Sequence, residues 1–324
     1  MRRRDFIKVV ASAAAMWPLA ARAQQAPKML RIGTVSAQPR SSPLWMAFER
    51  RMAELGYAQG ENFALEIVPA ASPEGFERGY RELAARNVDI FVASGPEIAL
   101  KSALAAARAL PIVMIAIDYD PLALDYVKSL ARPDGNVTGV FFQQIELAVK
   151  RAQLLKDAFP DPQAATVFWD AISADQWRAT QSAAKALGLR VAGIELRETP
   201  YDYERAFAQS PLDYRGQLLV MVSPFFFRDR AQLADLVLRH RVVSMFGSRE
   251  WVDAGGLVSY GASLPGLYRR AAEFVDRLAK GAKPSDLPIE QPTKFELIIN
   301  LRTAKATGLM IPESLLLRAD ELIE

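Results

Sequence analysis

The stretch VDIFVASGPEIALKSALAAARALPIVMIAI, residues 88–117, decides the fold. Two short apolar runs, 88–93 and 112–117, read as buried strands, and an Ala-rich helical pattern lies between them. Strands that are separated by a helix pair in parallel, because the connection must cross over the sheet. The stretch therefore predicts a βαβ unit, with the loop Ser94-Gly95-Pro96 at the carboxyl end of its first strand.

The same alternation runs along the rest of the chain. A first series of strands is expected at 30–35, 63–68, 88–93, 112–117 and 137–142, and a second at 165–169, 190–196, 217–222, 242–246 and 256–261. Helical patterns lie between them, for example at 44–55, 174–187 and 228–240. Two such series predict an α/β protein with two doubly wound parallel-sheet lobes that are joined by a multi-strand hinge.

The domain boundaries follow from these series. The junction between the lobes is expected near 141–144, before a helix that begins around Ile145. A long helix at about 265–280, a linker with three prolines, a strand at 295–300 and a helical tail complete the chain. We expect residues 24–141 with about 262–290 in the first lobe, and residues 142–261 with about 291–324 in the second.

Residues 1–23 have the layout of an export signal. A basic start, Arg2 to Arg4, precedes a short apolar run and the small-residue cleavage pattern Ala21-Arg22-Ala23. The pair Arg3-Arg4 before Asp5 resembles the twin-arginine motif, and an ordinary Sec signal is the alternative. Either signal predicts a mature protein that begins near Gln24 and lies in the periplasm.

Composition excludes several classes of function. The signal carries five of the 40 bases and one of the 37 acids, which leaves 35 bases against 36 acids and no basic surplus for nucleic acid. The absence of Cys excludes disulfides and thiolate-held clusters. His240, the only histidine, lies at the end of a helical pattern, where a solvated side chain is expected. We expect no metal and no cofactor.

Loops at the carboxyl ends of the strands are the expected ligand site, because ligands of open parallel sheets bind there. Small hydroxyl and Gly residues before helix starts leave backbone N–H groups that favour an anionic group. The Ser94 loop lacks the spacing and the Lys of a phosphate-binding loop, so a carboxylate fits it better than a triphosphate. The alternative is that Ser94 only caps its helix.

Charged and aromatic residues accompany these loops. Asp118, Asp120, Asp170 and Glu250 supply acids, and Arg249 supplies a base that could pair with a ligand carboxylate or with Glu250. Paired carboxylates could also perform acid and base catalysis, or simply cap helices. The segment SPFFFRD at 223–229 places at least one aromatic ring near the crevice.

Three segments carry a family resemblance: the tail QPTKFELIINLRTAKATGLMIPESLLLRADELIE at 291–324, ARPDGNVTGV at 131–140 and REWVDAGGLVSYG at 249–261. The chain resembles the ABC transporter substrate-binding proteins of the tryptophan/tyrosine type along its whole length. This resemblance implies a type I periplasmic-binding-protein fold, a small ligand between the lobes and a membrane permease as partner. Characterised members bind aromatic amino acids.

The resemblance also implies contacts from the Ser94, Asp118 and Asp170 loops, from Phe225 and from the pair Arg249-Glu250. The chain departs from the family at WDAISADQW, residues 169–177, where an Asn-Pro-rich loop is common, and at 246–248, where a Tyr is common. The resemblance and the positions of the loops together give these expected ligand contacts: Ser36, Gln38, Ser94, Gly95, Pro96, Asp118, Tyr119, Asp120, Phe142, Asp170, Ser173, Phe225, Ser248, Arg249, Glu250 and Tyr260.

The sequence thus predicts a periplasmic solute-binding protein of an ABC importer, not an enzyme. Its expected ligand is an aromatic amino acid or an aromatic or branched carboxylate. An exported enzyme that uses carboxylate chemistry, and a sensory binding protein that delivers its ligand to a receptor, are the alternatives.

Overall fold

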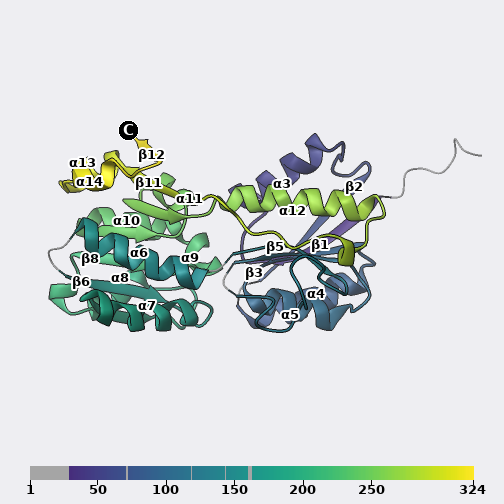
Figure 1. Ribbon diagram of the computed structural model, residues 1–324, viewed down its shortest axis with the longest axis horizontal. Coiled ribbons are helices and arrows are strands. Elements are labelled where there is room, and N and C mark those ends of the chain that lie inside the picture. The colour runs from purple at the N-terminus through teal and green to yellow at the C-terminus, as the bar shows by residue number, and fades with distance from the viewer. Residues whose placement is uncertain (1–28, 71, 118, 143, 160–162) are drawn as a thin grey trace, which may run out of the picture.

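The computed structural model describes residues 29–70, 72–117, 119–142, 144–159 and 163–324, which form two α/β lobes lying side by side (Figure 1). The predicted export signal and Asp118 lie outside the described residues. None of the helices in the described ranges is long and apolar enough to cross a membrane.

The first lobe contains a five-stranded parallel sheet in the order β2-β1-β3-β4-β5. Its strands are β1 Leu30–Ser36, β2 Phe63–Pro69, β3 Ile90–Gly95, β4 Ile112–Ala116 and β5 Val137–Phe141. Helices α4 Glu74–Ala85 and α5 Glu97–Ala106 cover one face, and α3 Pro43–Glu54 and α12 Leu264–Ala279 cover the other (Figure 1). Because both faces are covered, β3 and β4 are buried along their whole length, as their apolar sequences predict.

The second lobe contains a seven-stranded sheet in the order β12-β11-β10-β9-β8-β6-β7. Its strands are β6 Ala164–Trp169, β7 Arg190–Glu195, β8 Gln217–Val220, β9 Val243–Phe246, β10 Val258–Gly261, β11 Glu296–Asn300 and β12 Glu321–Ile323. The larger helices are α6 Gln144–Ala158, α7 Ala174–Leu187, α8 Tyr203–Gln209, α10 Arg230–His240 and α13 Leu301–Thr307, and shorter ones are α9 Pro224–Arg228, α11 Arg249–Asp253 and α14 Glu313–Leu316. These two mainly parallel sheets confirm the predicted fold class.

Two features of the second sheet differ from the prediction. Strand β11 pairs antiparallel with β10, and the tail expected to be helical ends in the strand β12. Asp320 fixes β12, because its backbone N–H donates to the Leu297 carbonyl and its Oδ2 accepts from the Leu297 N–H, both at 2.8 Å. A strand of three residues is too short to show a periodic pattern in the sequence.

The chain passes between the lobes at three places in the described ranges: after β5, between β10 and α12, and between the 3₁₀ turn η2 Pro284–Asp286 and β11. Residues near Glu290 stay with the first lobe, since Glu290 exchanges backbone hydrogen bonds of 3.0 Å with Gly139 and Phe141. Strand β11 joins the second sheet. We therefore propose the division of the chain stated above, with 262–290 in the first lobe and 291–324 in the second.

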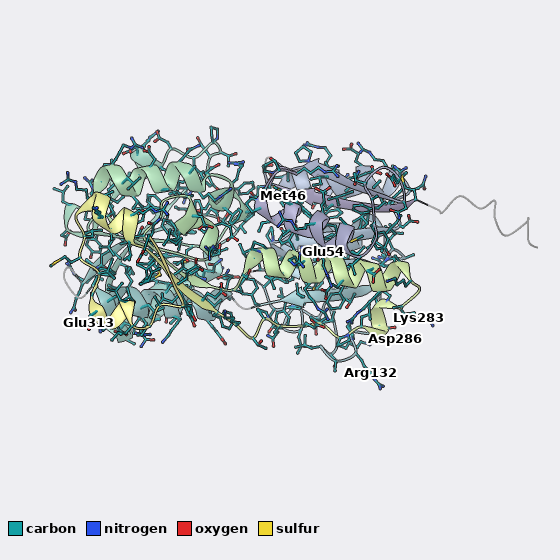
Figure 2. The ribbon with its side chains drawn as sticks, turned by 90° about the horizontal axis from the view of Figure 1, so that it is seen from above. Met46, Glu54, Arg132, Lys283, Asp286 and Glu313 are labelled. Carbon is teal, nitrogen blue, oxygen red and sulfur yellow. The ribbon has the colours of Figure 1, made fainter. Side chains whose placement is uncertain are left out.

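Helix α12 returns to the first lobe and packs on α3. The rings of Trp45 and Tyr268 meet edge to face with centroids 4.9 Å apart. Glu54 at the end of α3 pairs with Arg269 at 2.8 Å, and Figure 2 shows Glu54 beside α12. Surface pairs of this kind contribute at most about 1 kcal/mol, so the buried aromatic contact is the main source of stability between the two helices.

We predict that Gly139→Ala destabilises the protein more than Gly135→Ala. Both glycines have positive φ, +132° and +116°, so each substitution imposes the cost of a left-handed backbone. Only at Gly139 would the added Cβ overlap the backbone oxygen of Met114 on β4. The free energy of unfolding, measured with urea, should fall by about 1–3 kcal/mol more for Gly139→Ala. Equal losses would show that β4 and β5 can separate at this point without cost.

Candidate functional site

The loops at the carboxyl ends of the strands in the two lobes enclose a small cavity of about 40 Å³, called here the inner cavity. Both lobes and α12 line it. The lining residues are Ser36, Ala37, Gln38, Leu44, Phe76, Ser94, Gly95, Pro96, Ile117, Val222, Ser223, Pro224, Phe227, Leu264 and Tyr268. The lining is therefore mostly apolar, with a few polar groups placed between the apolar side chains.

Hydroxyl groups supply much of this polarity. Ser36 Oγ accepts from Trp45 Nε1 and from the Gln38 backbone N–H, both at 3.0 Å. Burial raises the pKa of Tyr268 to about 12, and a hydrogen bond with Ser94 offsets part of this rise. Tyr268 is therefore neutral at physiological pH, and the inner cavity has no charged side chain among its described lining residues.

Gln38 links the two lobes directly. Its Nε2 donates to the Pro224 carbonyl of the second lobe at 2.6 Å, and the residue is only 5% exposed. The carbonyl partner fixes the orientation of the amide, because the opposite orientation would set two oxygens against each other. Gln38 Oε1 is then buried with no partner in the described part of the chain. It is an acceptor at the cavity that lacks a donor.

Two larger cavities adjoin the inner one. The wide cavity, about 500 Å³, shares Pro96 with the inner cavity, and the side cavity, about 250 Å³, shares Pro73, Ala171 and Ile172 with the wide one. Both larger cavities have walls from the two lobes. The three neighbouring cavities are together called here the cleft, and the wide cavity alone has the size of a typical small-molecule pocket.

Asp170 lies at the side cavity, directly after β6, and is 1% exposed. Its carboxylate accepts four hydrogen bonds: from the Ser173 N–H at 3.0 Å, Ser173 Oγ at 2.8 Å, Tyr201 OH at 3.2 Å and Ser223 Oγ at 2.5 Å. Burial raises the pKa of Asp170, and these hydrogen bonds counteract the rise. All four donors are neutral, so they orient the carboxylate without cancelling its charge.

Most other charged residues of the cleft are acidic and have local partners. Glu97 accepts from Tyr126 OH at 2.6 Å, and Asp175 pairs with Arg178 at 2.5 Å. Glu195 pairs with Arg197 at 2.5 Å. Asp120 Oδ1 accepts from the N–H groups of Leu122 and Ala123 in the turn that follows it, where the capping alternative expected a helix. Acids thus surround the wide and side cavities.

The structure places nine of the sixteen residues expected from sequence at the three cavities. Those lining the inner cavity are Ser36, Gln38, Ser94, Gly95 and Pro96; those lining the larger cavities are Pro96, Tyr119, Asp120, Asp170 and Phe225. Ser173 does not line any of these three cavities, but it donates to the Asp170 carboxylate. This agreement concerns position only, and a ligand contact from each residue stays a prediction.

Arg249 does not lie at these cavities. Its side chain is 41% exposed, and its guanidinium donates to Glu321 of β12 at 2.7 Å and pairs with Asp253 at 3.3 Å. Strand β12 is not evident from the sequence, so a ligand carboxylate and Glu250 were the only partners expected for Arg249. Arg249 is therefore left out of the proposed site.

Four other expected contacts also lie outside the cavities described. Phe142 is buried in the apolar core, and Tyr260 packs against Phe295 while its carbonyl accepts from Arg151. Ser248 Oγ donates to Glu250 at 2.6 Å, and burial raises the pKa of Glu250. None of these four lines the inner, wide or side cavity, which strand ends alone do not reveal.

Several cavity residues were not predicted. Ser223, which follows β8, stands in an expected loop, but its bond to Asp170 could not be foreseen. Tyr201 lies in the loop between β7 and α8, and Leu264 and Tyr268 lie in α12, which follows β10. Within the described ranges, no group of three or more His, Cys, Asp or Glu residues is arranged to hold a metal ion.

Comparisons with known proteins agree with this architecture. A family model described as ABC transporter substrate binding protein matches residues 47–323. A tyrosine-binding protein of Clostridioides difficile (strain R20291) is 23% identical over 288 residues, which cover 86% of this chain and 80% of that protein.

Two solved structures show the same fold. An ABC domain from Streptococcus pneumoniae in complex with L-Trp has a TM-score of 0.76 at 22% identity. The match covers 91% of this chain and 100% of that domain's chain. A conserved domain protein from Vibrio cholerae O1 biovar El Tor has a TM-score of 0.78 at 18% identity, with 91% and 99% covered. The type I periplasmic-binding-protein arrangement expected from sequence is confirmed.

We predict a pH-dependent difference in stability between the wild type and Asp170→Asn. Because burial raises the folded-state pKa of Asp170, the folded chain binds this proton more readily than the unfolded chain. The contribution to stability is complete below the unfolded pKa of about 4 and is lost as pH rises through the folded pKa. The free energy of unfolding of the wild type should therefore increase relative to Asp170→Asn when pH falls from 7 toward 4. Urea titrations at several pH values measure this difference, and a constant difference would contradict it.

Proposed function

The chain belongs to the ABC transporter substrate-binding protein family, whose members bind solutes and are not enzymes, and on this premise we propose that it captures a small amphipathic molecule in the interlobe cleft for import. The cleft has walls from both lobes, and a direct hydrogen bond between Gln38 and Pro224 crosses it. This bond is the observation that carries the proposal. A ligand in the cleft can add contacts to both lobes at once and so favour their closure.

The proposed ligand is an aromatic amino acid, or an aromatic or branched carboxylate. Apolar side chains that would suit a ring or a branched chain line the inner cavity: Leu44, Phe76, Ile117, Val222, Phe227 and Leu264. The relative that is named for tyrosine and the similar domain that was solved with L-Trp support this choice. Since the inner cavity holds only about 40 Å³, an aromatic ligand must also occupy the wide cavity or separate the lobes.

The proposed partner is an ABC permease in the inner membrane, which would receive the ligand when the lobes open. Hinge closure around a ligand is a known signal in two-lobe binding proteins. The proposed location is the periplasm, with removal of residues 1–23 near Ala23 and Gln24 after export. The basic start and the cleavage pattern of these residues support this proposal.

We predict that aromatic amino acids raise the melting temperature of the protein in a thermal-shift screen. A ligand that binds only the folded state stabilises it by about 2.7 kcal/mol at a hundred times its Kd. Ser94→Trp, whose side chain is larger than the inner cavity, should lose the shift; because the buried indole also lowers the ligand-free melting temperature, the shift of each protein is measured against its own ligand-free value. If no aromatic or branched amino acid or carboxylate shifts the wild type, the proposed ligand class is wrong.

We also predict that Gln38→Met weakens ligand binding. The substitution keeps the volume of the side chain but removes the hydrogen bond between the lobes, which contributes about 0.5–1.5 kcal/mol. Calorimetry with the best ligand of the screen should show a Kd that is about 3–10-fold higher. Gln181→Met, on the exposed face of α7, is the matched control and should bind as the wild type does. An unchanged Kd in Gln38→Met would remove the Gln38–Pro224 bond from the closing mechanism.

A further inference from the structure

We propose that the cleft selects its ligand by positive charge, so that an ammonium group is required and a carboxylate is dispensable. The inference rests on the proposed function and narrows its ligand class, since it keeps the amino acids and excludes the aromatic and branched carboxylates that carry no amine. Aromatic or branched primary amines would bind alongside the corresponding amino acids, and the corresponding acids without an amine would not. Three observations support it.

The first observation is the uncompensated charge of Asp170. The carboxylate is 1% exposed and is held by Ser173, Tyr201 and Ser223, which are all neutral. No Lys or Arg in the described ranges forms an ion pair with it. A buried carboxylate that lacks a counter-ion is costly unless a cation reaches it. Because Asp170 lines the side cavity, a ligand ammonium in that cavity would lie near this charge, while the four hydrogen bonds of the carboxylate stay in place.

The second observation is the charge of the surrounding walls. The described residues that line the wide and side cavities include six acids, Glu74, Glu97, Asp120, Asp170, Asp175 and Glu195. Arg197 is the one base among them and pairs with Glu195 at 2.5 Å. Arg178, which is not among the lining residues, pairs with Asp175 at 2.5 Å, so acids outnumber these two bases by six to two. A cleft lined by one sign of charge concentrates ligands of the opposite sign. The same walls repel a ligand whose only charge is a carboxylate.

The third observation is the free acceptor of Gln38. Its Oε1 is buried at the inner cavity with no partner among the described residues, while its Nε2 is used by Pro224. Such an acceptor needs a donor, and leaving it unpaired is costly. An ammonium carries three N–H donors, whereas an ionised carboxylate carries none. The inner cavity offers a carboxylate only hydroxyl and backbone groups, because no Arg or Lys is among its described lining residues.

The experiment compares matched ligands by calorimetry on the purified protein. One series is tyrosine, tyramine and 3-(4-hydroxyphenyl)propanoate, and the other is leucine, 3-methylbutylamine and 4-methylpentanoate. In at least one series the amine should bind with a Kd within tenfold of the amino acid, and the acid should bind at least 100-fold more weakly. An acid that binds as tightly as its amine would overturn the charge inference and leave the proposed function intact. If no member of either series binds, both fail.

The variant Asp170→Asn separates charge recognition from a structural role. It keeps the shape of the side chain and removes the charge, so the ratio of amine to acid affinity should fall at least tenfold. Damage to the fold alone would weaken both ligands equally and leave this ratio unchanged, which would contradict the inference. Glu313→Gln is the control, because Glu313 is exposed at the end of the second lobe farthest from the first (Figure 2). Its ratio should equal that of the wild type.

Discussion

The packing of α12 on α3 is the contact on which the rest of the structure depends. Residues more than 200 positions apart meet there, with Tyr268 against Trp45 and Arg269 paired with Glu54. Because α12 completes the first lobe, the chain must leave the second lobe before it and return to that lobe after it. These two extra crossings turn a single connection into a hinge of three segments. The same helix also brings Tyr268 and Leu264 to the inner cavity, so one contact sets both the hinge and part of the site.

The site combines apolar walls with a few buried polar groups whose partners are fixed. Trp45 Nε1 holds Ser36, and Asp170 receives four hydrogen bonds from its own lobe. Side chains held in this way lose little conformational entropy when a ligand binds, since folding has already ordered them. Water excluded by closure also lowers the local dielectric constant, which strengthens every electrostatic contact that remains. The charge of Asp170 therefore matters more in the closed cleft than it would on an open surface.

The fold could be predicted from the sequence because it depends on two local features, the apolar runs that form strands and the loops that follow them. Apolar runs such as 112–117 identify buried strands, and the loop after each strand is placed at one edge of the sheet by the geometry of parallel pairing. Ser36, Ser94 and Asp170 were found this way. Tyr268 could not be found, because it lies within a helix and reaches the cleft only through the return of α12. Arg249 was misplaced because its partner Glu321 lies 72 residues away, on a strand too short to predict.

In each of the three segments that cross between the lobes, only a few residues lie between the contacts that hold its two ends. On the first lobe, backbone hydrogen bonds hold Glu290 against β5, which leaves only 291–295 before β11 begins. On the second lobe, the buried Arg151 bonds to Gln144 and, at 2.9 Å, to the Tyr260 carbonyl, and so fixes the start of α6 to the end of β10. Ser263 caps α12 through the Gly266 N–H, so the second crossing is reduced to Ala262 and Ser263. Crossings this short would permit a rotation of one lobe relative to the other but little translation. The proposed closure would then open or close the cleft while each lobe keeps its share of the cavity walls.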